Sequence, residues 1–167
     1  ELPCTGVERA KAKGCVSGTS RNFIECPLVD GGAGSRAYFA AAGGNSDELG
    51  TILVHERGAA EWHDEEGRRP LHAACRHGHS TCVSLLVNAG AHLDYQADTG
   101  WTPLICAAYW GHADCVRLLL GAGADWRPYG RGRHGMRRTA RGWALNTRND
   151  RCAALLHAAE RAATLRA

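Results

Sequence analysis

The stretch from Gly67 to Ala124 constrains the fold more than any other feature, because it contains nearly the same segment twice. Residues 67–91 read GRRPLHAACRHGHSTCVSLLVNAGA, and residues 100–124, which start 33 positions later, read GWTPLICAAYWGHADCVRLLLGAGA. Each copy has the pattern of a turn, a short helix, a Gly-His break, a longer apolar helix and a Gly-Ala stop. Such a unit cannot bury its apolar face without a neighbour, so the repeat indicates a stack of similar units.

Five elements keep the same register in both copies: the Pro-Leu start, a pair of small residues, the Gly-His, the Leu-Leu and the Gly-Ala. In the second copy the start is complete as Thr102-Pro103-Leu104. With these motifs at these spacings, the chain resembles the ankyrin-repeat family. The resemblance implies an all-α fold, a short solenoid of about four helix-turn-helix units including degenerate caps.

The residues outside the two clear copies show the same rhythm in a weaker form. Residues 1–34 carry Gly, Ser, Lys and Cys without helical or strand periodicity, and we interpret them as an irregular N-terminal arm. The last unit starts late, because Pro103 and Ala140 are separated by 37 residues instead of 33. We place the ankyrin-like domain at 35–166, with a cap at 35–66, repeats at 67–99 and 100–134, and a C-terminal cap at 135–166.

The late start reflects an inserted loop, and residues 127–141 around it hold six Arg and no acid. The net charge of the whole chain is +3, so the rest of the chain is at +3 − 6 = −3. Guanidinium groups bind carboxylates and phosphates in a bidentate manner. The loop is therefore either a solvated segment or a site for an acidic or phosphate-bearing partner. We find no element suited to reading nucleic-acid bases and expect no nucleic-acid partner. The loop residues that we predict as contacts are Tyr129, Arg131, Arg133, Arg137 and Arg138.

The resemblance also implies a concave groove, formed by inner helices and projecting turns, that binds protein partners. In the family, the residue pair before each Gly-His and the turn positions face this groove. Aromatic side chains and Arg are the usual anchors of protein interfaces. We therefore predict partner contacts at Glu65, Glu66, Arg68, Arg76, His77, Trp101, Tyr109 and Trp110. The alternative for the three aromatic residues is that they pack on the adjacent turn.

The chain has eight cysteines, and five of them fall inside the repeat helices. Cys82, Cys115 and Cys152 occupy the same position in successive units, where a thiol behaves as a small buried hydrophobe. This pattern favours free thiols and a reducing intracellular compartment, either the cytoplasm or an organelle matrix or stroma after removal of a targeting segment. The remaining three lie in the arm without the short spacing that a zinc site needs, namely Cys4, Cys15 and Cys26.

No set of residues in the sequence assembles a nucleophile, a base and an orienting group. His79 and His112 belong to the repeated break, and His72 to the Pro-Leu-His start, where the resemblance implies hydrogen bonds within the turns. We expect no enzyme activity, no catalytic residue, no cofactor and no metal.

We interpret the chain as a non-catalytic protein–protein interaction module, an adaptor or a structural or accessory subunit of a larger assembly. An organellar complex, respiratory, photosynthetic or ribosomal, fits the start at Glu1, which indicates a fragment or a processed chain. No apolar run is long enough to span a bilayer, although docking on a membrane complex is compatible with the sequence. The alternative is a regulatory segment of an enzyme whose catalytic domain lies outside this chain.

Overall fold

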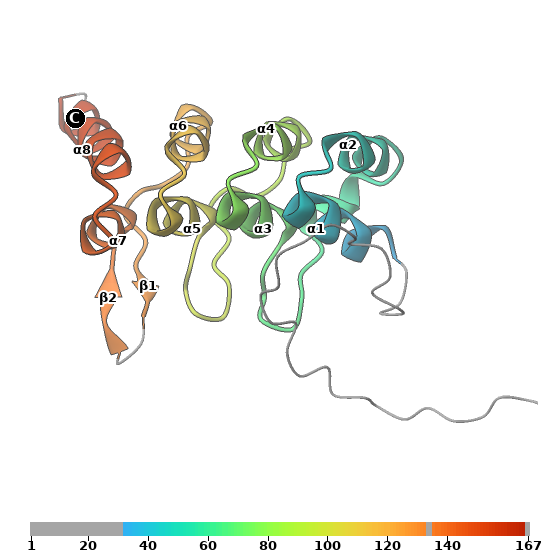
Figure 1. The fold of residues 1–167 in the computed structure, drawn as a ribbon, viewed down its shortest axis with the longest axis horizontal. Helices are drawn as coiled ribbons and strands as arrows, with labels where there is room; N and C mark the ends of the chain where they lie inside the picture. The colour runs from blue at the N-terminus through green and yellow to red at the C-terminus, as the bar shows by residue number, and fades with distance from the viewer. Residues whose placement is uncertain (1–31, 133–134, 166–167) are drawn as a thin grey trace, which may run out of the picture.

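The computed structural model in Figure 1 describes residues 32–132 and 135–165. Most of the predicted arm therefore lies outside the described residues, together with Cys4, Cys15, Cys26 and Arg133. The first helix begins at Ala33, two residues before the expected start of the domain at position 35.

The described residues form a stack of helix pairs in two rows, which confirms the predicted fold class (Figure 1). Neighbouring inner helices contact each other along one row, and neighbouring outer helices along the other. The turns between units project beyond the inner row (Figure 1). The inner helices are α1 (Ala33–Gly43), α3 (Pro70–His77), α5 (Pro103–Trp110) and α7 (Ala140–Asn146). The outer helices are α2 (Ser46–His55), α4 (Ser80–Asn88), α6 (Ala113–Gly121) and α8 (Asp150–Thr164), and a short 3-10 helix, η1 (Arg57–Glu61), follows α2.

The repeated start and break of the sequence set the ends of the inner helices. Pro70 and Pro103 occupy the first turn, where the missing backbone N–H costs no helical hydrogen bond. The Thr102 hydroxyl accepts a hydrogen bond from the Ile105 N–H at 3.2 Å and caps α5. Gly78 and Gly111 end α3 and α5 in the left-handed conformation, with φ of 79° and 83°. Glycine adopts this conformation without steric cost, so each inner helix stops at the same point of the repeat.

The residue after each of these glycines connects one unit to the previous one. Nε2 of His79 lies 3.1 Å from the Ala42 carbonyl oxygen, and Nε2 of His112 lies 3.1 Å from the Arg76 carbonyl oxygen. In the last unit Asn149 replaces the histidine, and its amide donates to the Tyr109 carbonyl oxygen at 2.8 Å. These bonds satisfy carbonyl groups at the helix ends, and they fix the spacing between units.

Small and branched apolar side chains fill the space between the rows. Leu86, Leu119 and Leu156 are almost fully buried at equivalent positions of the outer helices. The five described cysteines are free and buried, as the sequence indicates. Burial raises the pKa of the Cys115 thiol to about 11, which keeps it in the unreactive protonated form.

The inserted loop has regular structure in the residues that are described. It contains a short antiparallel pair of strands, β1 (Gly130–Arg131) and β2 (Arg137–Arg138), in which Gly130 pairs with Arg138 and Arg131 with Arg137. The expected boundary between positions 134 and 135 lies between these two strands in the sequence. The backbone of β1 is also attached to the preceding turn, because the Arg131 N–H donates to the Thr99 carbonyl oxygen at 3.0 Å.

The C-terminal pair of helices keeps the repeat geometry with altered residues. The Thr139 hydroxyl accepts from the Gly142 N–H at 3.3 Å and caps α7. Arg141, at a position that is apolar in the other units, pairs with Glu160 of α8 at 2.9 Å. Arg148 stands where the other units have glycine, and its φ is +59°.

Replacing Arg148 with Gly is expected to increase the free energy of unfolding by about 1 kcal/mol, because a side chain in the left-handed region is strained. The side chain of Arg148 is exposed, so little packing is lost. Urea unfolding of the two proteins measures the difference. A variant of equal or lower stability would contradict a strained backbone at this position.

Candidate functional site

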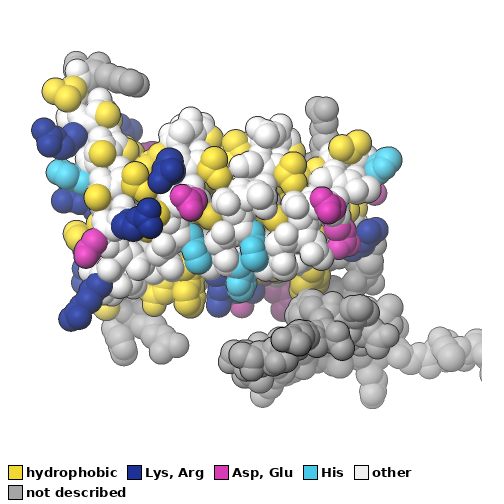
Figure 2. Space-filling view, turned by 45° about the horizontal axis from the view of Figure 1, so that its top comes forward, with side chains coloured by type: hydrophobic (Ala, Val, Ile, Leu, Met, Phe, Trp, Pro, Cys, Tyr) yellow, Lys and Arg dark blue, Asp and Glu magenta, His cyan; other side chains and the backbone are white. Residues whose placement is uncertain are grey.

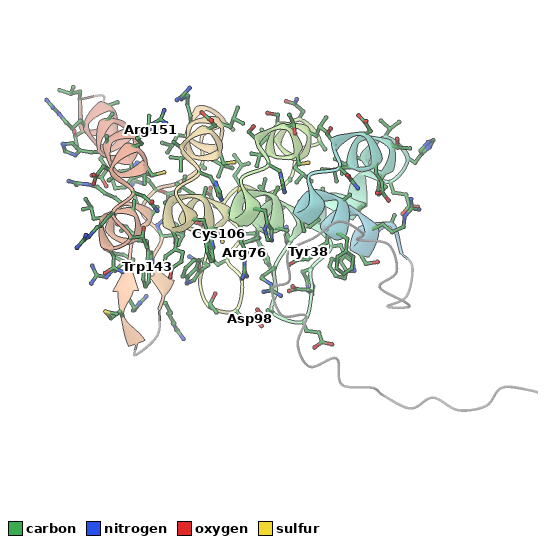
Figure 3. All side chains as sticks on the ribbon, viewed as in Figure 1. Tyr38, Arg76, Asp98, Cys106, Trp143 and Arg151 are labelled. Carbon is green, nitrogen blue, oxygen red and sulfur yellow. The ribbon has the colours of Figure 1, made fainter. Side chains whose placement is uncertain are left out.

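A groove with a volume of about 690 Å³ runs along the inner helices on the side of the projecting turns. In Figure 3 Tyr38, Arg76 and Trp143 all extend from the inner helices toward this side. The lining comes from equivalent positions of successive units. Ala73, Cys106 and Trp143 form one such series, and Arg76, Tyr109 and Asn146 form a second.

Seven residues predicted from the sequence line this groove: Glu66, Arg68, Arg76, Trp101, Tyr109, Trp110 and Arg131. The other described candidates lie outside its lining. Glu65 is exposed on the turn, and the ring of His77 stacks on that of His79 with centroids 6.2 Å apart. The Arg137 guanidinium lies 5.9 Å from the centroid of the Tyr129 ring. Arg138 is half-buried, and its guanidinium contacts the Met136 sulfur at 3.8 Å.

Four rings form an aromatic cluster at the end of the groove toward α7: Trp101, Tyr109, Trp110 and Trp143. Ring centroids are 5.1 Å apart for Trp101 and Tyr109, and 5.7 Å apart for Tyr109 and Trp143. The Trp101 indole N–H also donates to the Arg131 carbonyl oxygen at 2.6 Å. Trp101 and Tyr109 thus pack on neighbouring elements, whereas Trp110 remains 49% exposed. Of the three predicted anchors, Trp110 offers the most free surface to a partner.

The prediction missed Trp143, Tyr38 and Met136, which also line the groove. Trp143 could have been found from the repeat register. The 37-residue offset between Pro103 and Ala140 aligns it with Cys106, which also lines the groove. The position of Met136 depends on the strand pair, which has no signal in the sequence.

The arginines that line the groove are of two kinds, those paired with an acidic side chain and those without such a partner. Arg68 binds Asp64 at 2.7 Å and Glu66 at 2.9 Å. Burial raises the pKa of the Asp64 carboxyl, but hydrogen bonds from Arg68 and the Glu66 N–H outweigh this effect and leave the pKa below its ordinary value. The Arg76 guanidinium lies over the Trp110 ring, 5.5 Å from its centroid. Within residues 32–132 and 135–165, no ion pair joins Arg76 or Arg131 to an acid.

His72 lies at the base of the groove and has the structural role that the resemblance implies. It is 2% exposed. Its Nδ1 accepts a hydrogen bond from the Arg69 N–H at 3.2 Å, so Nε2 carries the proton and donates to the Trp101 carbonyl oxygen at 3.0 Å. Burial lowers the pKa of His72 to about 4, despite the favourable bond from Nε2 to a backbone oxygen.

Lowering the pH from about 7 to about 5 is expected to reduce the free energy of unfolding by about 2 kcal/mol through His72. The unfolded chain binds this proton near pH 6.5, but the folded chain does so only near pH 4. The contribution is therefore complete above pH 6.5 and is lost as the pH falls toward 4. Urea unfolding against pH, compared between the wild type and His72→Gln, isolates this contribution. Identical pH slopes in the two proteins would contradict it.

In the part of the chain that the structure describes, no group of His, Cys, Asp or Glu side chains is placed to hold a metal ion. Cys106 lies on the groove floor, and burial raises the pKa of its thiol to about 12. The arrangement offers apolar rings and guanidinium groups, which are suited to binding.

The comparisons with known proteins agree with this architecture. The family model of ankyrin repeats in three copies matches residues 37–128. The chain belongs to the ankyrin-repeat family, whose domains are typically non-catalytic modules that bind protein partners.

Two similar proteins illustrate the relationship. Cortactin-binding protein 2 of Ornithorhynchus anatinus is 41% identical over 66 residues, which are 39% of this chain and 4% of that protein. The crystal structure of the human ASB11 ankyrin repeat domain has a TM-score of 0.64 and 28% identity, and the match covers 73% of this chain and 52% of that one. The chain thus spans a small part of the first relative and about half of the second. Among the described residues, no helix has the length and apolar character needed to cross a membrane.

Proposed function

We propose that this chain is a non-catalytic interaction module that acts as an adaptor or as a structural or accessory subunit of a larger assembly. The observation that carries the proposal is the groove of about 690 Å³, which combines an aromatic cluster with arginine side chains. Clustered aromatic and Arg side chains dominate the energetics of protein interfaces. Trp110 is the principal anchor in this proposal, because it is the most exposed ring of the cluster.

We also propose a reducing intracellular compartment as the place of action. The support is the set of free, buried cysteines in the helices. Cysteines that serve as free packing groups are typical of reducing compartments, whereas disulfides form and persist in oxidising ones.

Replacing Trp110 with Ala is expected to reduce partner affinity about thirtyfold, or about 2 kcal/mol, because an aromatic anchor that the partner would cover is lost. The measurement is affinity isolation of tagged full-length chain from its native source, with quantification of each co-purifying protein. Val54→Ala is the matched control, because Val54 is 78% exposed on the outer helix α2. Circular dichroism confirms that both variants fold.

Partners that are recovered with the wild type and Val54→Ala, but depleted with Trp110→Ala, would support the groove as the binding surface. Equal recovery with all three proteins would show that the groove is not used. Figure 2 shows the side of the outer helices, where hydrophobic side chains are scattered among other residues. The control residue Val54 belongs to this outer row, in α2.

A further inference from the structure

The groove is electrically uneven along its length. Toward α1, the Arg68 guanidinium is neutralised by carboxylates of its own turn, at 2.7 Å from Asp64 and 2.9 Å from Glu66. Beside the aromatic cluster, Arg76 of α3 and Arg131 of β1 line the groove without an acidic partner among the described residues. Unpaired positive charge therefore lies in the part of the groove that also offers the exposed ring of Trp110.

Both unpaired arginines extend from firmly held backbone. Arg76 is in the last turn of α3, and its carbonyl oxygen receives the bond from His112. Arg131 is in β1, where its N–H is bonded to the Thr99 carbonyl oxygen and its own carbonyl oxygen to the Trp101 indole. A guanidinium group that stacks on a ring keeps its N–H donors free at its edge, and such a group binds carboxylates well.

A partner that covers Trp110 must also cover these two charges. Burying a charge without a counter-ion is costly, whereas the attraction of a paired carboxylate offsets much of the lost solvation. At the other end of the groove the situation is reversed, because Glu66 disfavours an additional acid there. The electrostatics thus select both the composition and the direction of the partner.

Resting on the interaction function proposed above, we propose that the groove binds a protein segment in which one large apolar side chain is flanked by acidic residues. The apolar side chain packs on Trp110 and Tyr109, and the carboxylates pair with Arg76 and Arg131. The rest of the segment, which passes Arg68 and Glu66, is neutral.

Three short synthetic peptides test this inference with the purified full-length chain, by fluorescence anisotropy. The first carries Leu-Phe between Glu and Asp residues, the second has Gln and Asn in place of the acids, and the third has Ala-Ala in place of Leu-Phe. The acidic apolar peptide is expected to bind about tenfold more tightly than the amide peptide at about 50 mM salt, and the difference is expected to shrink at about 0.5 M salt. The Ala-Ala peptide is expected to be the weakest of the three.

Variants of the chain assign the preference to particular arginines. Arg76→Gln and Arg131→Gln are each expected to weaken the acidic peptide about threefold and to leave the amide peptide unchanged. Arg151→Gln is the matched control, because Arg151 is exposed on α8 and lies away from the groove (Figure 3). It is expected to change neither peptide.

Equal affinity for the acidic and amide peptides, or no binding of either up to about 1 mM, would overturn the inference. So would a dimer, detected by light scattering, that Trp110→Ala converts to a monomer, because a second copy would then occupy the groove. If the peptides fail in this way but Trp110→Ala still depletes the native partners, the proposal of an acidic segment is wrong and the interaction function stands. If Trp110→Ala leaves partner recovery unchanged, the proposed function itself fails.

Discussion

Replacing Gly78 with Ala is expected to lower the free energy of unfolding by about 3 kcal/mol. Gly78 has a φ of +79°, which strains any residue with a β-carbon. In addition, a β-carbon at this position would lie 2.4 Å from Nδ1 of His112, the ring that bonds the Arg76 carbonyl oxygen. The substitution therefore combines backbone strain with loss of the contact between neighbouring units.

Gly90 provides the matched control for this substitution. Its φ is +83°, yet no heavy atom lies within 4 Å of a β-carbon built there. Gly90→Ala is thus expected to lower the free energy of unfolding through backbone strain alone, by about 1 kcal/mol. Urea unfolding gives the free energy of unfolding of both variants. The difference between the two values measures the contribution of the His112 contact. Equal destabilisation of the two variants would contradict a role for this contact in joining the units.

Replacing Trp143 with Ala is expected to lower the free energy of unfolding by about 4 kcal/mol, as is usual when a large buried aromatic side chain is removed. Trp143 is 4% exposed and packs against Trp101 and Tyr109, with ring centroids 5.5 Å and 5.7 Å apart. It connects α7 to the preceding unit. Because each unit of a repeat protein is stabilised mainly by its neighbours, the C-terminal helix pair is expected to unfold before the rest.

The measurement is urea unfolding followed by circular dichroism, together with hydrogen exchange of the α7 and α8 amides. Leu145→Ala is the control, since Leu145 belongs to the same helix but is 54% exposed. It is expected to change stability by less than about 0.5 kcal/mol. A Trp143→Ala protein with wild-type stability would show that the aromatic cluster does not attach the C-terminal unit.

The sequence predicts the solenoid well because the fold is encoded in local, repeated chemistry. Proline at a helix start, glycine at a left-handed helix end and the following histidine each have a single structural solution that recurs every 33 residues. The strand pair at Gly130 to Arg138 could not be predicted in this way. It contains only two residues in each strand, too few for an alternating pattern, and it depends on the contact between Arg131 and Thr99.

The candidate site was predictable where its residues keep fixed positions in the repeat. Arg76 and Tyr109 precede the Gly-His break, so their places on the groove follow from register alone. The loop residues were selected instead because the loop is rich in Arg. This composition does not specify which of the side chains face the groove. Arg131 enters the groove, while Arg137 lies against Tyr129 outside it.

The central claim is that the groove beside Trp110 is the surface that holds the partner. Photo-crosslinking tests it most directly, with benzoyl-phenylalanine placed in separate full-length proteins at position 110 or at position 118. Leu118 is 37% exposed on the outer helix α6, so it gives the label comparable access to solvent. The native partner is expected to crosslink from position 110 and not from position 118. Crosslinking from position 118 alone would contradict binding in the groove and would place the partner on the outer row of helices.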